Sequence, residues 1–179
     1  MTSVKDFVIF IMFISLFSAC SPQLSPFTEN LYKSSSWSDE ELSKIQFYLS
    51  DNIVLRRQIT DGNSSIISGK IKIENGKEVE EVLIQKGTPG VFIKKKNDEV
   101  FAISFEKGDK YLFFGPNPKR GGRYVLLATD WDKNKGKVSY NDKVFYTLDE
   151  SAMASLLVDL RKIDKINVKR HTASGRKVN

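Results

Sequence analysis

Side chains that commonly act as nucleophiles, general bases or metal ligands are scarce in this chain. The sequence has one cysteine, Cys20, and one histidine, His171. Ser–His–Asp and Cys–His catalysis need an imidazole that is held in place, whereas His171 follows the last apolar pattern of the chain. A zinc site needs several His or Cys ligands. We therefore expect no catalytic residue, no metal ligand and no cofactor among the common types, and the sequence has no glycine-rich nucleotide-binding motif.

Acidic side chains are the remaining candidates for catalysis or metal binding. Glycan hydrolysis by a carboxylate pair needs one carboxyl group whose pKa is raised by an apolar setting. Asp159, within Leu156–Leu160, comes nearest to this, but helical spacing places it off the apolar stripe. Asp130–Asn134 has the alternating oxygen ligands that begin a calcium loop, yet Lys135 stands where that loop requires glycine. We interpret this segment as a polar turn.

The loop over Gly115–Arg123 is the most suggestive binding segment. Two prolines stiffen it, and two glycines let the backbone approach a ligand closely. Lys119, Arg120 and Arg123 could hold a phosphate or carboxylate group, the arginines with two hydrogen bonds each. The loop joins the two most apolar predicted strands, so a rigid scaffold would present it. The alternative is a long hairpin connection with solvated charges.

The positive charge of the chain is concentrated at its C-terminal end. The net charge is +6 overall, and residues 161–179 contain seven basic residues and one acidic residue, so they alone carry 7 − 1 = +6. A polybasic end attracts anionic lipid head groups, nucleic acid or an acidic partner. The alternative is a solvated, mobile tail. The candidate binding residues here are Lys169, Arg170, Arg176 and Lys177.

Helical patterns flank the middle of the chain. Ser38 and Glu41 form a capping box that predicts a helix over Asp39–Ser50. Thr147 and Glu150 form a second capping box. The apolar stripe Met153, Leu156, Leu157 and Leu160 follows it and predicts a C-terminal helix, before a short strand over Lys165–Lys169.

Residues 52–146 change to the period-two pattern of β-strands. Tight turns are predicted at Asn75-Gly76, at 94–98 and at Asn141-Asp142. About eight short strands without alternating helices indicate a mainly β fold with one N-terminal and one C-terminal helix. We expect a small antiparallel barrel, such as an SH3-like barrel, or a curved sheet.

The N-terminus has the three parts of an export signal. Lys5 precedes the apolar run Phe7–Ala19, and small residues lead into Cys20. The run has 13 residues, too few for a helix that spans a bilayer. Leu16–Cys20 resembles the lipobox of bacterial lipoproteins. The alternative is an ordinary secreted protein with a cysteine near its cleavage site.

The resemblance implies that Cys20 is acylated and becomes the mature N-terminus. Ser21, rather than Asp, follows it, which in diderm lipoproteins favours the outer membrane, facing the periplasm. Several acyl chains anchor a protein stably. We therefore expect residues 1–19 to be a signal peptide and 20–36 a lipid anchor and tether whose second half packs on the body. Residues 37–169 should form a globular β-rich domain and 170–179 a basic mobile tail.

These expectations favour a non-enzymatic accessory or assembly subunit that binds an envelope partner. Its partners would be the membrane, through the anchor, an envelope protein, and an anionic lipid or polysaccharide; nucleic acid is not expected in that compartment. Two alternatives stay open: a lipid-anchored hydrolase of the cell wall that uses carboxylates, and a binder of an anionic envelope polymer.

Overall fold

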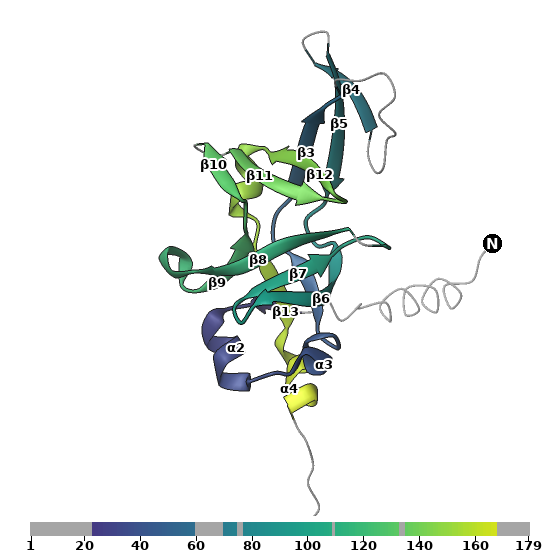
Figure 1. The fold of residues 1–179 in the computed structure, drawn as a ribbon. Helices are drawn as coiled ribbons and strands as arrows, with labels where there is room; N and C mark the ends of the chain where they lie inside the picture. Colours follow the sequence, from purple (N-terminus) through teal and green to yellow (C-terminus); the bar gives the residue numbers. More distant parts are fainter. Residues whose placement is uncertain (1–22, 60–69, 75–76, 109, 133–134, 168–179) are drawn as a thin grey trace, which may run out of the picture.

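The computed structural model describes residues 23–59, 70–74, 77–108, 110–132 and 135–167. These residues form two antiparallel sheets with short helices at one end (Figure 1). The prediction of a mainly β fold with flanking helices is confirmed. Of the two forms expected, the structure is the curved sheet, because neither sheet closes into a barrel.

The first sheet has seven strands in the order β1-β13-β2-β6-β7-β8-β9. It curls so far that its two edges approach each other, and isolated backbone bridges join Thr28 to Arg123 and Val125 to Ser155. The sheet is therefore strongly curved, and these bridges join its edges. Its strands are β1 (Leu24–Pro26), β2 (Gln46–Leu49), β6 (Pro89–Asn97), β7 (Val100–Ser104), β8 (Tyr111–Asn117), β9 (Arg123–Leu126) and β13 (Leu156–Asp159).

The second sheet has six strands in the order β10-β11-β12-β3-β5-β4. The strands on either side of Asn75-Gly76 pair with each other, as predicted, although these two residues lie outside the described ones. The hairpin at Asn141-Asp142 is confirmed, with Tyr140 opposite Lys143. The strands are β3 (Ile53–Gln58), β4 (Lys70–Glu74), β5 (Lys77–Ile84), β10 (Asp130–Asp132), β11 (Lys135–Tyr140) and β12 (Lys143–Thr147).

The predicted N-terminal helix is much shorter than expected. Its capping box forms, since the Ser38 hydroxyl accepts a hydrogen bond from the Glu41 backbone N–H. The helix α3 (Asp39–Leu42) then ends, and the predicted continuation to Ser50 is wrong. Residues Gln46–Leu49 instead form β2, which pairs with β13 and β6. The helix α2 (Glu29–Ser35) precedes α3.

In the C-terminal segment the structure has a strand followed by a helix, whereas the sequence predicted a helix followed by a strand. The Thr147 hydroxyl accepts a hydrogen bond from Gly136 N–H at 2.8 Å and does not cap a helix. Of the apolar stripe, Leu156 and Leu157 lie in β13, whereas Met153 precedes this strand and Leu160 follows it. The predicted strand from Lys165 begins inside a helix, and Val168–Lys169 lie outside the described residues. The elements here are the 3-10 turn η2 (Asp149–Met153), β13 and the helix α4 (Leu160–Asn167).

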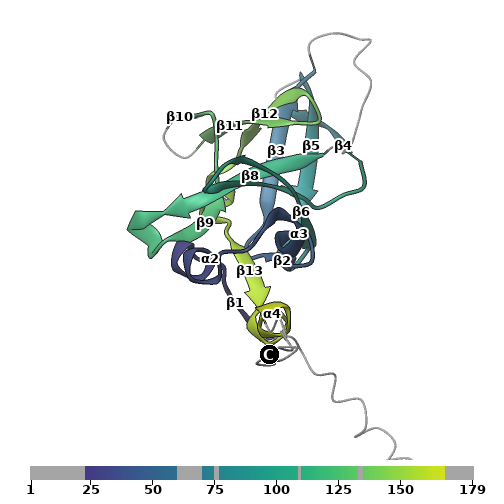
Figure 2. The same ribbon diagram turned by 60° about the horizontal axis from the view of Figure 1, so that its bottom comes forward.

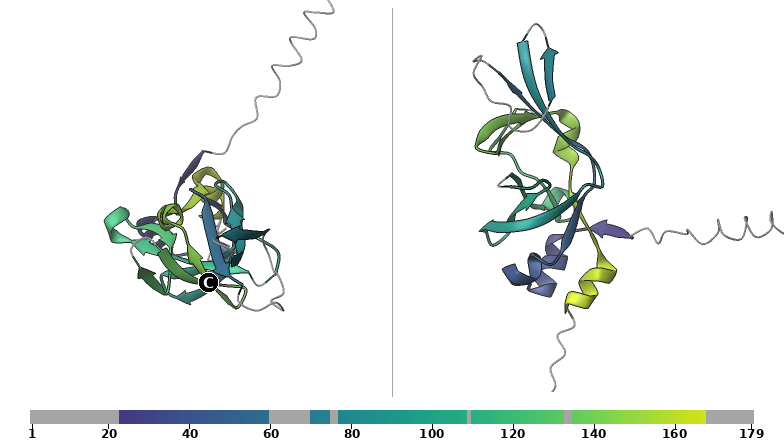
Figure 3. Two further views of the ribbon diagram at one scale, coloured as in Figure 1. Left: turned by 90° about the horizontal axis from the view of Figure 1, so that it is seen from above. Right: turned by 90° about the vertical axis from the view of Figure 1, so that its right-hand side faces the viewer.

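The α-helices α2, α3 and α4 lie at one end of the domain and the second sheet at the other (Figure 3). The longest helix, α4, has eight residues. No helix in this part of the chain could span a membrane.

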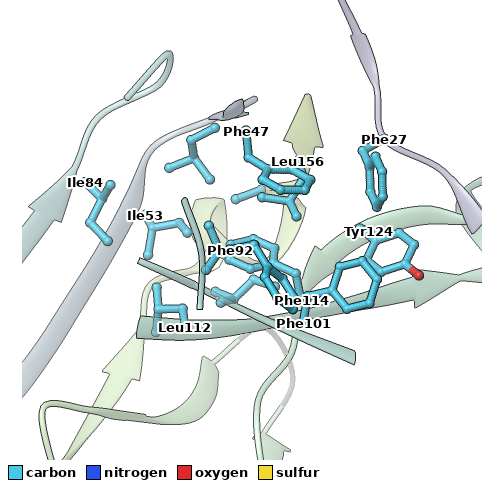
Figure 4. Packing of buried hydrophobic residues seen from close by; sticks show 14 of the residues in the cluster. Phe27, Phe47, Ile53, Ile84, Phe92, Phe101, Leu112, Phe114, Tyr124 and Leu156 are labelled. Atoms are coloured by element: carbon cyan, nitrogen blue, oxygen red, sulfur yellow. The ribbon is translucent and has the colours of Figure 1, made fainter. Parts of the chain in front are cut away.

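The core joins the inner faces of both sheets (Figure 4). Phe27 is fully buried and packs edge-on against Phe47 and Tyr124, at ring-centroid distances of 5.2 and 4.8 Å. Residues 24–36, which the sequence analysis assigned to the tether, therefore belong to the domain, in line with the expectation that its second half packs. Residues 20–22 lie outside the described chain.

Candidate anion-binding site

The hairpin between β8 and β9 presents three of the predicted binding residues. It contains a 3-10 turn, η1 (Pro118–Arg120), which Asn117 caps: the Asn117 side-chain oxygen accepts a hydrogen bond from Lys119 N–H at 3.0 Å. Gly121 and Gly122 follow in the left-handed region, with φ of 64° and 69°, a conformation that other residues rarely adopt. The prolines and glycines of the loop thus shape a tight, defined turn.

The hairpin is held against the rest of the domain at two points. Glu29 N–H, at the start of α2, donates to the Gly122 carbonyl at 2.8 Å. Arg120 Nη1 donates to the Met153 carbonyl at 2.9 Å. These contacts come from opposite ends of the chain, so the position of the three cations is set by the whole fold.

Lys119, Arg120 and Arg123 line one hollow of about 590 Å³. Its other wall comes from Pro26 and Thr28, at and just after the end of β1. The hollow lies at the seam where the curled sheet brings Thr28 opposite Arg123. The sequence predicted the three basic residues. It did not predict the wall formed by Pro26 and Thr28, because that wall depends on the curvature of the sheet.

No ion pair joins these three cations to a carboxylate within the described segments. Glu29, the carboxylate on the adjoining turn of α2, is paired with Lys33, which also contacts Glu99 at 3.0 Å. Hydrogen bonds to Glu29 and then to Glu99 raise the pKa of Lys33 above its ordinary value. The positive charge around the hollow is therefore available to an external phosphate or carboxylate group, which arginine binds with two hydrogen bonds.

The remaining predicted binding residues are not placed by the structure. Cys20, Lys169, Arg170, Arg176 and Lys177 lie outside the described residues, as does His171.

A second basic surface was missed by the sequence analysis, which placed a hairpin tip at 94–98. The strand β6 continues through Asn97 instead, with register shifts that turn Lys94 and Lys96 to its solvent side. The Lys94 ammonium lies 4.8 Å from the ring centroid of Tyr111, and that of Lys96 lies 5.2 Å from Phe113. Three consecutive lysines followed by alternating aromatic residues were the available signal.

The buried carboxylates of the described chain are each held by an arginine. Glu80 pairs with Arg57 at 2.6 Å. Asp159, the predicted candidate for acid catalysis, accepts hydrogen bonds from Arg161, which lower the pKa of its carboxyl group. A general acid at neutral pH needs a raised pKa instead, so this setting does not suit Asp159 to that role.

Comparison with known proteins finds no relative of this chain. No protein-family model, no curated protein and no solved structure matches the chain.

Proposed function

We propose that this chain is a lipoprotein of the bacterial outer membrane that acts as a non-enzymatic accessory or assembly subunit. Acylated Cys20 would anchor it on the periplasmic side. One observation carries the proposal: three cations without a carboxylate partner in the described chain surround a hollow, and its other wall belongs to the segment that follows Cys20. The hollow would bind a phosphate or carboxylate group of an envelope partner.

The path of the N-terminal segment supports anchoring close to the body. Leu24 is paired with β13, and Phe27 is fully buried. Only the chain between Cys20 and Leu24 is left to act as a tether, and four extended residues span about 14 Å. An acyl anchor at Cys20 would therefore hold the domain at the membrane surface, as an accessory subunit requires.

The basic hollow supports binding rather than carboxylate hydrolysis. A glycan hydrolase needs two carboxyl groups facing one cleft, one of them protonated at neutral pH. The walls of the hollow are instead cationic. An anionic envelope polymer is a second candidate ligand, because repeated phosphate groups would also suit three adjacent cations.

The anchor is tested by comparing the native chain with Cys20→Ser after cell fractionation. Acyl insertion resists high salt, whereas purely electrostatic attachment is screened. We expect the native chain to stay in salt-washed membranes, Cys20→Ser to be released, and mass spectrometry to find acyl chains on Cys20. An unmodified thiol, or equal retention of both forms after the salt wash, would refute the anchor.

Partner binding is tested by affinity purification from membranes solubilised in mild detergent. The hollow variant carries Lys119→Gln, Arg120→Gln and Arg123→Gln. Its control carries Lys107→Gln, Lys135→Gln and Lys137→Gln, an equal charge change at exposed positions outside the hollow. We expect the native chain and the control to retain an envelope component that carries phosphate or carboxylate groups, which the hollow variant loses. If both variants retain the partner, the hollow is not its binding site. Recovery of phosphate-rich polymer alone would favour the second candidate ligand.

A further inference from the structure

The antiparallel pairing of β1 with β13 brings two distant parts of the chain together. Leu24 lies directly opposite Asp159, and α4 begins at the next residue, Leu160. Figure 2 shows β1 beside β13, with α4 at the end of that strand. The place where the chain arrives from Cys20 is therefore also the place where the basic C-terminal segment begins.

Cations lie at both ends of β1. At its start, Arg161 and Lys162 project from the first turn of α4 and are exposed. Arg161 forms an ion pair with Asp159, whereas Lys162 makes no ion pair with any described residue. At the other end of β1, Pro26 forms part of the hollow that holds Lys119, Arg120 and Arg123.

We propose that this side of the domain, β1 with the flanking hollow and the first turn of α4, docks on the bilayer that holds the anchor. The hollow would take the phosphate of an anionic phospholipid head group. This inference rests on the proposed anchor at Cys20 and names the ligand of the same hollow. Pro26 is six residues from Cys20, so even an extended chain keeps the hollow within about 20 Å of the acylated residue.

Docking in this way gives the domain one orientation. Figure 2 shows β1 and α4 at one end of the molecule and β10, β11 and β12 at the other. The second sheet would then point away from the membrane. Its exposed apolar side chains Val144 and Tyr146, which are 47% and 50% exposed, would then lie on the side opposite the bilayer.

The first experiment measures binding to vesicles without the anchor. It uses the chain from residue 20 onward with Cys20→Ser, which contains every described residue, and vesicles of phosphatidylcholine with or without about one-third phosphatidylglycerol. Each cation near an anionic surface strengthens binding about five-fold. We expect binding only to the phosphatidylglycerol vesicles, on the order of 100-fold weaker for the hollow variant, and less than about five-fold weaker for the control variant.

The second experiment locates the membrane contact without removing a charge. Cys20 is the only cysteine, so in the Cys20→Ser chain a fluorophore can be placed at Pro118→Cys, on the hairpin, or at Ser139→Cys, on β11. Nitroxide-labelled lipid should quench the fluorophore on the hairpin and leave that on β11 unquenched. The comparison holds even if the two labelled chains differ in melting temperature, because quenching is measured only on chains that are folded and bound to vesicles.

Three results would overturn the docking inference: equal weakening by the hollow and control variants, equal quenching at the two labels, or absence of binding to phosphatidylglycerol vesicles. None of these affects the anchor, which depends on acylation and on salt-resistant retention of the native chain in cells. Conversely, an unmodified Cys20 would refute the anchor while vesicle binding by the hollow is measured independently.

Discussion

Arg57 and Glu80 face each other across β3 and β5 and form an ion pair inside the domain. Arg57 Nε lies 2.6 Å from Glu80 Oε2, the Glu80 side chain is fully buried and that of Arg57 is 13% exposed. The Arg57 guanidinium also lies 5.8 Å from the ring centroid of Phe145 on β12. The pair therefore fixes three adjacent strands of the second sheet at a point where the neighbouring inward-facing positions are apolar.

Removing one member of this pair should destabilise the protein strongly. Glu80→Ala leaves the Arg57 charge without its carboxylate in a largely dry site, and breaking such pairs costs about 3–5 kcal/mol. We expect the free energy of unfolding, measured by urea titration, to fall by this amount. The double variant Arg57→Met, Glu80→Leu should recover most of the loss, because it leaves no buried charge.

The exposed ion pair between Lys44 and Glu40 is the matched control. Its side chains are 58% and 80% exposed, and pairs of this kind contribute at most about 1 kcal/mol. If Glu80→Ala costs no more than Lys44→Ala, the charge of Arg57 is solvated and the account of a buried pair is wrong.

Local signals in the sequence predicted two of the hairpins and the start of α3, because short-range interactions decide these features. The capping box of Ser38 and Glu41 and the turn at Asn141-Asp142 both form as predicted. The assignments failed where an apolar pattern fits both a helix and a strand. Phe47 and Leu49 are buried in β2, between strands that come more than 40 and more than 100 residues later, and such pairing outweighs local propensity.

The candidate site was predictable in part for the same reason. Lys119, Arg120 and Arg123 lie within one loop, so their closeness follows from the sequence itself. Thr28 reaches Arg123 only because the sheet curls until its edges meet. The placement of Lys94 depends on a register shift between β6 and β7, which periodicity does not reveal.

Asp142→Gly should stabilise the hairpin between β11 and β12. Asn141 and Asp142 have φ of 51° and 58°, and the second position of such a two-residue turn favours glycine. Relieving the left-handed strain at Asp142 should raise the free energy of unfolding by about 0.5–1 kcal/mol. Ser139→Gly, on the adjoining strand, should instead lower it. Equal effects of the two variants in urea titrations would contradict this account of the turn.

Two buried tyrosines should respond oppositely to loss of their hydroxyl groups. Tyr140 donates to Glu106 Oε1 at 2.6 Å and so joins β11 to the turn between β7 and β8. Tyr124 is fully buried, and its hydroxyl has no hydrogen-bond partner in the described chain. Tyr140→Phe should cost about 1.5 kcal/mol, whereas Tyr124→Phe should be neutral or stabilise by up to about 1 kcal/mol. Thermal and urea unfolding of both variants at pH 8 would measure this, and a loss for Tyr124→Phe would mean that its hydroxyl is hydrogen-bonded after all.

The same tyrosines should make the protein sensitive to alkali. Burial, which is the larger cause, raises the pKa of both above the ordinary 10.0, and the hydrogen bond to Glu106 raises that of Tyr140 further. Above pH 10 the unfolded chain loses these protons while the folded chain keeps them, so the free energy of unfolding falls as pH rises. Below pH 10 neither state loses them and the effect disappears.

Each buried tyrosine should add a slope of up to about 1.4 kcal/mol per pH unit above pH 10. Urea titrations between pH 8 and pH 11 should therefore show a shallower decline for Tyr140→Phe and for Tyr124→Phe than for the native chain, and the shallowest decline for the double variant. Lysines also titrate in this range, but they are unchanged among the four proteins and cancel in the comparison. Parallel curves for all four would show that the two hydroxyl groups ionise as readily in the folded chain as in the unfolded one, and would contradict their burial.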